Sequence, residues 1–258
     1  MGIGLQHLIL KENNNQTNLT LSVGLNSISL SVFDLASGEL IKFDKSNFNN
    51  PLSIDRMLNE LKDIINKNEL DFKKFENIKL LQQNNLSVLV PGELYSEKQK
   101  RTYLKYNTQI RNDDFIAVDN LNNLKIKNIY IPYININNYL VDLFKNIEYF
   151  HYDTELLNKL YKIRRNEEFF VHVDNRQIKI IVFEKDKLNF FNSYEIDNSS
   201  DIIYYVLLVL KEKKLNIDKT EIIYIYDYEY DDLSNISDKF FRNHKILNRN
   251  YESDFLHC

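Results

Sequence analysis

Two aspartates stand where the chain could bind a catalytic metal ion. Asp174 ends a predicted strand that begins near Phe169, and Asp227 ends the strand predicted at 221–227. Two carboxylates bridged by Mg²⁺ could activate water for phosphodiester hydrolysis. A third carboxylate on a helix, which such a nuclease needs, has no clear counterpart. Asp174 followed by Asn175 is also typical of a hairpin turn, so we favour the turn and keep a metal-dependent nuclease as an alternative.

Two histidines are each followed by acids at alternate positions. His151 with Asp153 and Glu155, and His172 with Asp174, would share one face of a strand. Neither pair has an identifiable third ligand or nucleophile nearby. Both histidines are therefore expected to be surface or structurally satisfied residues, and no metal site is predicted.

Two strand pairs invite comparison with the hairpins that hold nucleotide phosphates. Residues 19–34 and 169–184 each alternate apolar and polar side chains on both sides of a tight turn. Phosphate binding in such hairpins needs glycine, because backbone N–H groups must approach the oxygens closely. The first turn has a glycine but no preceding Asp, the second has an Asp but no glycine, and no glycine follows Gly92. The positions that would face a phosphate are Gly24, Asn26, Ser27, Asp174 and Arg176.

The two strand pairs also repeat each other. Aligned without gaps at an offset of 150, they share four identical residues and the same apolar alternation. The identical residues are Val23, Ile28, Val32 and Phe33 in the first copy, and Val173, Ile178, Val182 and Phe183 in the second. This repetition indicates a duplicated unit.

The order of predicted elements extends the duplication. Each hairpin is followed by a third strand, at 38–43 and 187–194, and then by a helix. Strand, strand, strand, helix, strand, helix is the order of a ribonuclease H-like module. We predict an α/β protein of two tandem lobes. An N-terminal extension covers 1–17, the first lobe 18–166 and the second, shorter lobe 167–258.

The middle of the first lobe carries additional predicted elements. They are a hairpin at 77–91, a helix at 96–106, a strand pair at 115–119 and 125–131, and helices at 136–145 and 154–163 around a strand at 147–152. The expected helix caps are Ser53, a capping box of Ser96 with Gln99, Asn135, and Ser199 or Ser200.

Three stretches carry a resemblance to a known family. They are "VPGELYSEKQKRTYLKYN" (90–107), "NIYIPYININNYLVDLF" (128–144) and "LNFFNSYEIDNSSDIIYYVLL" (188–208). They resemble an uncharacterised bacterial family, a domain of unknown function with the actin-like ATPase fold shared by actin, Hsp70 and sugar kinases. The resemblance implies this fold and no particular reaction, so function must be argued from the site.

The stretch around Pro132 is the most distinctive segment. A strand-to-helix junction there would gather the side chains of Tyr130, Tyr133, Asn137, Asn138 and Tyr139. Clefts of α/β proteins often lie at such junctions. We expect a structural role for it, and a ligand or partner site here if the protein has one.

Composition limits the classes of partner and compartment. The formal charge of −4 lacks the basic excess that nucleic-acid binding requires, so no nucleic-acid partner is expected. The single cysteine, Cys258, excludes an internal disulfide and favours a reducing compartment. No signal peptide or membrane-spanning run is identifiable. A cytoplasmic location without membrane contact is expected.

The expected function follows from the incomplete set of glycines and aspartates in the two hairpin turns. We predict a non-catalytic, actin-like scaffold that binds an unknown protein partner, with no cofactor and a degenerate nucleotide site. A divergent ATPase that binds ATP with Mg²⁺ is the main alternative. In the degenerate site, Arg176 or its neighbours are expected to fill the phosphate position.

Overall fold

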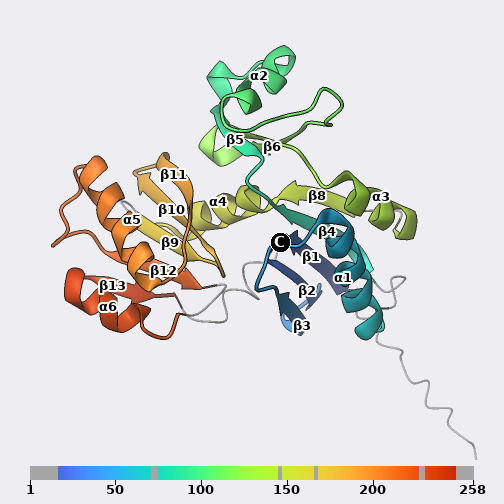
Figure 1. Ribbon diagram of the computed structural model, residues 1–258, viewed down its shortest axis with the longest axis horizontal. Helices are drawn as coiled ribbons and strands as arrows, with labels where there is room; N and C mark the ends of the chain where they lie inside the picture. The colour runs from blue at the N-terminus through green and yellow to red at the C-terminus, as the bar shows by residue number, and fades with distance from the viewer. Residues whose placement is uncertain (1–16, 71–74, 145–146, 166–167, 227–229, 248–258) are drawn as a thin grey trace, which may run out of the picture.

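The computed structural model describes residues 17–70, 75–144, 147–165, 168–226 and 230–247. Figure 1 shows two lobes joined side by side, with a small sheet standing above the first. Each lobe is built on a five-stranded mixed sheet. Within the described residues, no helix is long and apolar enough to cross a membrane.

The first sheet has the strand order β3-β2-β1-β4-β8. Its strands are β1 (Thr17–Gly24), β2 (Ser27–Asp34), β3 (Leu40–Asn47), β4 (Phe75–Gln83) and β8 (Ile147–His151). β1, β2 and β3 are antiparallel neighbours, whereas β4 and β8 extend the sheet in parallel. Parallel neighbours need helical crossovers, which α1 (Ile54–Lys67) and α3 (Ile134–Leu143) supply.

The second sheet repeats this order as β11-β10-β9-β12-β13. Its strands are β9 (Glu168–Val173), β10 (Gln177–Glu184), β11 (Lys187–Glu195), β12 (Ile222–Tyr226) and β13 (His244–Ile246). The crossovers are α5 (Ser199–Glu212) and α6 (Leu233–Phe240). Both sheets therefore have the order expected of a ribonuclease H-like lobe, and the predicted fold class is confirmed.

Strand register confirms the offset of 150 between the two copies. Val23 pairs with Ile28 in the first hairpin, and their counterparts Val173 and Ile178 pair in the second. Each copy also carries a β-bulge where its second strand meets its third. The register shifts between Val32 and Phe33 in one and between Val182 and Phe183 in the other. An irregularity repeated at the same position is a strong sign of duplication.

Each sheet has its own apolar core beneath its crossover helices. Leu61 of α1 and Leu140 of α3 pack against alternate residues of β1 and β2 such as Leu21. Val206 of α5 packs likewise on Ile180 of β10. Period-2 alternation in the strands and helical spacing in the crossovers bring these faces together.

A third core joins the lobes around α4 (Tyr152–Ile163). Leu156 and Leu160 of this helix share one buried cluster with Leu81 of the first sheet and with Phe170 and Ile223 of the second. Figure 1 shows α4 lying between the two sheets. The chain passes from the first lobe to the second directly after this helix.

The predicted hairpin at 77–91 is wrong. β4 and β5 (Ser87–Pro91) follow each other in the chain, yet β5 belongs to a separate three-stranded sheet of order β5-β7-β6. Its other strands are β6 (Ala117–Leu121) and β7 (Ile126–Tyr130), which form the predicted antiparallel pair. Alternation shows that both 77–83 and 87–91 are strands, but it does not show which sheet each one joins. The helix expected at 96–106 is shorter, α2 (Lys100–Lys105), preceded by a 3-10 turn.

Of the predicted helix caps, the one at Ser53 is confirmed and the others are wrong. Ser53 caps α1 as expected, with its side chain accepting from the N–H of Arg56. Ser96 forms no side-chain cap, and α3 begins at Ile134, so Asn135 lies inside the helix. α5 is capped by Asn198 in a capping box with Asp201, before the predicted serines. Asn is as good a cap as Ser, so residue preference alone could not separate neighbouring candidates.

Candidate functional site

Gly24 makes room for a neighbouring side chain. It ends β1 and lies beside Gln83, the last residue of β4. A Cβ atom at Gly24 would stand 3.2 Å from the Gln83 Cβ and 3.4 Å from its Oε1. Glycine here therefore lets the Gln83 side chain lie against the hairpin, in the space that a phosphate-binding glycine would leave open.

Three side-chain hydrogen bonds cross from the first lobe to the second hairpin turn. Gln83 Nε2 donates to Asp174 Oδ2 at 2.6 Å. Asn175 Nδ2 donates to the carbonyl of Phe48 at 3.1 Å, and Gln177 Nε2 donates to Asn85 Oδ1 at 2.7 Å. We call these three contacts the seam. They join the second hairpin turn to first-lobe residues, of which Gln83 and Phe48 contact the first hairpin at Gly24 and Asn26.

The second turn is also held by its own lobe. The Asp174 N–H donates to the Gln177 carbonyl at 2.9 Å, and the Asn175 N–H donates to Asp174 Oδ1 at 2.7 Å. Tyr230 Oη donates to the Asn175 carbonyl at 2.6 Å, and the Ile196 N–H donates to the Arg176 carbonyl at 3.0 Å. Two N–H groups that a phosphate would need at this turn thus already have acceptors.

Arg176 does not itself cross the gap between the hairpins. Its guanidinium pairs with Asp197 of its own lobe at 2.8 Å, in an exposed position. In the first turn the Asn26 carbonyl accepts from the N–H of Phe48, and Ser27 begins β2. Asn26 Oδ1 is buried and accepts no hydrogen bond from the described residues. The neighbours of Arg176 reach the first lobe, whereas Arg176 points to Asp197.

The predicted carboxylate pair is only half described. Asp174 directly follows β9, and both of its carboxylate oxygens accept hydrogen bonds, from Gln83 and from the N–H of Asn175. Asp227 lies outside the described residues. Among the residues that are described, no three His, Cys, Asp or Glu side chains gather closely enough to hold a metal ion.

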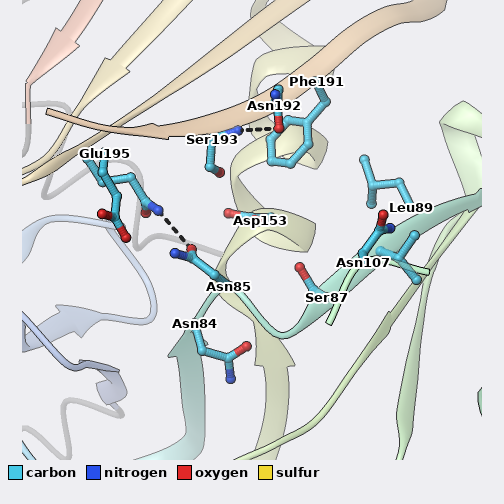
Figure 2. A pocket seen from close by; sticks show the side chains of 12 residues that line it. Asn84, Asn85, Ser87, Leu89, Asn107, Asp153, Phe191, Asn192, Ser193 and Glu195 are labelled. Atoms are coloured by element: carbon cyan, nitrogen blue, oxygen red, sulfur yellow. Dashed lines mark hydrogen bonds between the residues drawn. The ribbon is translucent and has the colours of Figure 1, made fainter. Parts of the chain in front are cut away.

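A cavity of about 570 Å³ lies beside the seam. Figure 2 shows the link between β4 and β5 on one side of it, β11 on the other, and Asp153 of α4 behind. The lining is mostly amide and hydroxyl: Asn84, Asn85, Ser87, Asn107, Gln177, Asn192 and Ser193. Among the described residues that line it, the charged ones are Asp153 and Glu195, both acids, and none is Lys or Arg. An anionic phosphate would find no cation among these described side chains.

A buried polar cluster stands behind the cavity. Lys179 of β10 forms an ion pair with Asp153 of α4, and both side chains are almost fully buried. Burial opposes the charge of Asp153, but the Lys179 ammonium still holds the pKa of its carboxyl below the usual value. Burial lowers the pKa of His151, which keeps the ring neutral. Its Nδ1 accepts from the Asp153 N–H at 3.2 Å, and its Nε2 donates to the Asn84 carbonyl at 3.0 Å.

Asp119 of β6 is the second buried acid of this region. It accepts from the His151 N–H at 2.8 Å, from Thr154 Oγ1 at 2.8 Å and from Tyr130 Oη at 3.2 Å. Burial raises the pKa of Asp119 to about 6, against the effect of these hydrogen bonds. The network fixes the small third sheet to the start of α4.

The strand face expected for His151, Asp153 and Glu155 is wrong. β8 ends at His151 and α4 begins at Tyr152, so His151 and Asp153 meet through a helix cap instead of along a strand. His172 lies in β9 with its Nε2 3.1 Å from Tyr152 Oη. Both histidines are buried. The helix begins directly after a short strand, so too few residues remain on either side of the boundary to show the change from a period of 2 to a period of 3.6.

The strand-to-helix junction places its five predicted residues differently. Tyr130, Tyr133 and Asn137 are buried, Tyr139 is half-buried and Asn138 is exposed. Gln82 holds the junction, because its Oε1 accepts from the Tyr133 N–H at 2.5 Å and its Nε2 donates to Asn137 Oδ1 at 2.8 Å. Tyr133 also lines a second cavity.

That second cavity, of about 680 Å³, is largely apolar. Its apolar lining is Ile54, Leu86, Phe115, Ile131, Pro132, Tyr133 and Ile134, with Gln109, Arg111, Asp113, Asp114 and Asn135 as the polar remainder. Phe115 is 53% exposed and Ile54 45%, so large apolar side chains stand open to solvent here. The cavity lies at the junction singled out in the sequence.

Sequence reasoning missed the residues that form the seam on the first lobe. Gln83 and Asn85 belong to an uninterrupted amide run, Gln82 to Asn85, that directly follows the buried part of β4. Four amides at the end of a strand beside a predicted turn are a readable signal for a polar contact between elements. Nothing in the sequence indicated Phe48, which contributes only its carbonyl.

Comparison with known proteins agrees with this architecture. Residues 9–244 match the family described as "Protein of unknown function (DUF3822)". The chain belongs to the DUF3822 family. The predicted resemblance to a family of unknown function is thereby confirmed. No curated protein matches the sequence.

Solved structures place this DUF3822 protein in the actin-like ATPase fold. A protein from Bacteroides thetaiotaomicron, described as having an actin-like ATPase fold and unknown function, is 19% identical with a TM-score of 0.78, over 94% of this chain and 96% of its own. The type IV pilus biogenesis complex PilM-PilN gives 9% identity and a TM-score of 0.58, covering 92% and 89%. The cytoplasmic domain of EpsL from Vibrio cholerae gives 10% and 0.50, covering 93% and 92%.

Proposed function

We propose that this DUF3822 protein is a non-catalytic, actin-like scaffold that binds another protein in the cytoplasm. The seam carries the proposal. In actin-like ATPases the phosphates lie between the two hairpins, and here the second hairpin turn is hydrogen-bonded directly to first-lobe residues by Gln83, Asn175 and Gln177. A triphosphate would have to break these contacts to enter.

Electrostatics argues against phosphate at the same place. Asp174 presents a carboxylate at the seam, and the described lining of the adjoining cavity contains two acids but neither Lys nor Arg. Each seam hydrogen bond stabilises the closed lobes by about 0.5–1.5 kcal/mol, and the bond to the Asp174 carboxylate by somewhat more. Binding of a phosphate would break these hydrogen bonds, and no Lys or Arg among the described lining residues would pair with it.

Neighbours of the same fold support a role in protein assembly. One is solved as a complex of PilM with PilN in type IV pilus biogenesis, and another is a component of a type II secretion system. Both proteins act within larger assemblies. Their likeness to this chain is one of fold, so the partner of the DUF3822 protein has to be found by experiment.

The apolar cavity at the strand-to-helix junction is the proposed partner surface. Phe115 and Ile134 are exposed members of its lining, and Asp113 and Asp114 outweigh the charge of Arg111 among the described lining residues. Exposed apolar side chains around a cavity are typical of protein interaction sites. The expected occupant is a protein segment that inserts apolar side chains and carries a basic residue next to them.

Affinity capture with a matched pair of variants tests this surface. Phe115→Ser removes an apolar side chain from the cavity, and Tyr204→Ser removes a similarly exposed aromatic side chain from α5 in the other lobe. We expect one specific partner to be recovered with wild type and with Tyr204→Ser, and to be lost with Phe115→Ser. Equal recovery with all three proteins would exclude the cavity as the partner surface.

Nucleotide titration tests the scaffold against the ATPase alternative. We expect calorimetry with Mg-ATP to give no heat of binding for wild type. The Gln83→Ala variant opens the seam on one side and serves as the comparison. Micromolar binding to wild type, lost when the Gly24 turn is altered, would falsify the scaffold.

The nuclease alternative requires its own assay. Asp174 is the described member of its carboxylate pair, so cleavage of nucleic acid with Mg²⁺ or Mn²⁺ has to depend on it. We expect no cleavage by wild type. Cleavage that disappears in Asp174→Asn would establish the nuclease instead of the scaffold.

A further inference from the structure

One face of the first sheet carries small polar side chains that are buried. Thr20 and Ser22 of β1 and Ser29 and Ser31 of β2 are each at most 8% exposed. They point away from α1, because the alternate residues of both strands form the core beneath that helix. Ser31 Oγ has no hydrogen-bond partner among the described residues. A buried hydroxyl is costly without a partner, so this face calls for a polar cover.

The second sheet shows what covers the equivalent face. At the offset of 150, the four small residues correspond to Phe170, His172, Lys179 and Ile181. The start of α4 lies on these side chains. Tyr152 Oη is 3.1 Å from His172 Nε2, the Lys179 ammonium lies 4.7 Å from the Tyr152 ring centroid, and Leu156 clusters with Phe170 and Ile181. This helix directly follows β8, the fifth strand of the first sheet.

The sequence after the fifth strand of the second sheet repeats the start of α4. β13 ends at Ile246, and residues 248–258 lie outside the described part of the chain. α4 begins Tyr-Asp-Thr-Glu-Leu-Leu at 152–157, and residues 251–256 read Tyr-Glu-Ser-Asp-Phe-Leu. All six positions match in class: aromatic, acid, hydroxyl, acid, apolar and Leu. Asn250, a preferred capping residue type, stands where His151 caps α4.

We propose that the face formed by Thr20, Ser22, Ser29 and Ser31 is the docking site of the C-terminal segment 250–258 of the same chain. Each lobe then covers the sheet of the other with the segment that follows its own fifth strand. By the equivalence of the two copies, Tyr251 meets Ser22 and Glu252 meets Ser29, as Tyr152 meets His172 and Asp153 meets Lys179.

The two docking faces complement their segments in size and polarity. The face on the second sheet is built of large residues and receives Leu156, whereas the face on the first sheet is small and receives the larger Phe255. Serine hydroxyls also replace the Lys179 ammonium as the donors for an acid, here Glu252. This docking requires neither a protein partner nor a nucleotide, so it stands apart from the proposed function.

Thiol crosslinking in the full-length protein tests the contact directly. Cys258 is replaced by serine, and a short bis-maleimide is added to a variant with Ser29→Cys and Glu252→Cys. The control carries Glu60→Cys with Glu252→Cys, because Glu60 is exposed on α1, on the opposite side of the sheet. We expect an internal crosslink in the Ser29 pair and none in the Glu60 pair. Crosslinking that is absent from the Ser29 pair, or equal in both, overturns the proposal.

Stability and hydrogen exchange give a second, independent measurement. Phe255→Ala is expected to lower the melting temperature by about 5 °C and to speed amide exchange in β1 and β2, because the cover of that face is weakened. His257→Ala changes a position whose α4 counterpart, Asn158, follows the repeated motif, and it is expected to leave both quantities unchanged. Unaltered exchange in β1 and β2 with Phe255→Ala contradicts the docking.

Discussion

At the scale of single residues, the site is defined by the hydrogen-bond partner of each polar group. Gly24 would be read as a phosphate-binding glycine, but its missing side chain accommodates Gln83, which then donates to Asp174. Asp174 would be read as a metal ligand, but both of its oxygens accept hydrogen bonds from this chain. The same residue types therefore hold the lobes together at the place where the sequence invited comparison with a phosphate site.

The Gln83–Asp174 contact is expected to couple measurably. A double-mutant cycle with Gln83→Ala and Asp174→Ala should give a coupling free energy of about 1–2 kcal/mol, because the acceptor is a partly buried carboxylate. The exposed Arg176–Asp197 pair provides the control, and a cycle with both residues changed to Ala should give at most about 0.5 kcal/mol. Urea unfolding measures both coupling free energies. Equal values for the two pairs would show that the seam contact stabilises the protein no more than an exposed ion pair does.

Asp119 is expected to make stability depend on pH. Its pKa is raised from 3.8 to about 6 in the folded protein. The stability gained from binding this proton is therefore fully present below about pH 3.8 and is lost as the pH rises through 6. Asp119→Asn should flatten the unfolding free energy across this range, by up to about 3 kcal/mol. An unchanged pH profile of urea unfolding would show that Asp119 titrates normally.

At the scale of secondary-structure elements, a capping side chain near the helix N-terminus determines where the helix begins. α5 is capped by Asn198, whose side chain accepts from the N–H groups of Ser200 and Asp201. Asn198→Ala should lower the free energy of unfolding by about 1 kcal/mol, because these N–H groups lose their acceptor. Ser200→Ala, at the neighbouring predicted cap, should change it by less than about 0.5 kcal/mol. Thermal unfolding of the two variants measures the difference, and the reverse order would contradict the assigned cap.

The duplicated elements were predictable from sequence because their signals are local. Alternation located both hairpins and their turns, and the offset of 150 related the two copies correctly, because the equivalent pairs Val23–Ile28 and Val173–Ile178 both form. The strand β5 was assigned to the wrong sheet, since its partner β7 lies far along the chain. The seam was missed for the same reason. Gln83 and Asp174 are 91 residues apart, and only the packed lobes bring them together.

At the scale of the whole molecule, the core around α4 makes one body of two lobes. Its buried cluster contains side chains from both five-stranded sheets. Loss of α4 would therefore expose apolar surface on both sheets at once. We expect a single cooperative unfolding transition, with equal calorimetric and van't Hoff enthalpies. Leu156→Ala should lower its midpoint without splitting it, because the cavity weakens both lobes together. Two separate heat-absorption peaks would show that the lobes unfold independently.

The repeated β-bulge has a consequence for how the protein meets other chains. Both bulges lie in the pairing with an outer strand, β3 or β11, which forms one edge of its sheet. β3 exposes Leu40, Ile41 and Phe43, a composition that would favour strand addition and fibre growth on a flat edge. A bulge bends the strand and increases its twist, so the row of backbone donors and acceptors loses its regular spacing. The bulge is therefore expected to make this apolar edge a poor template for an added strand.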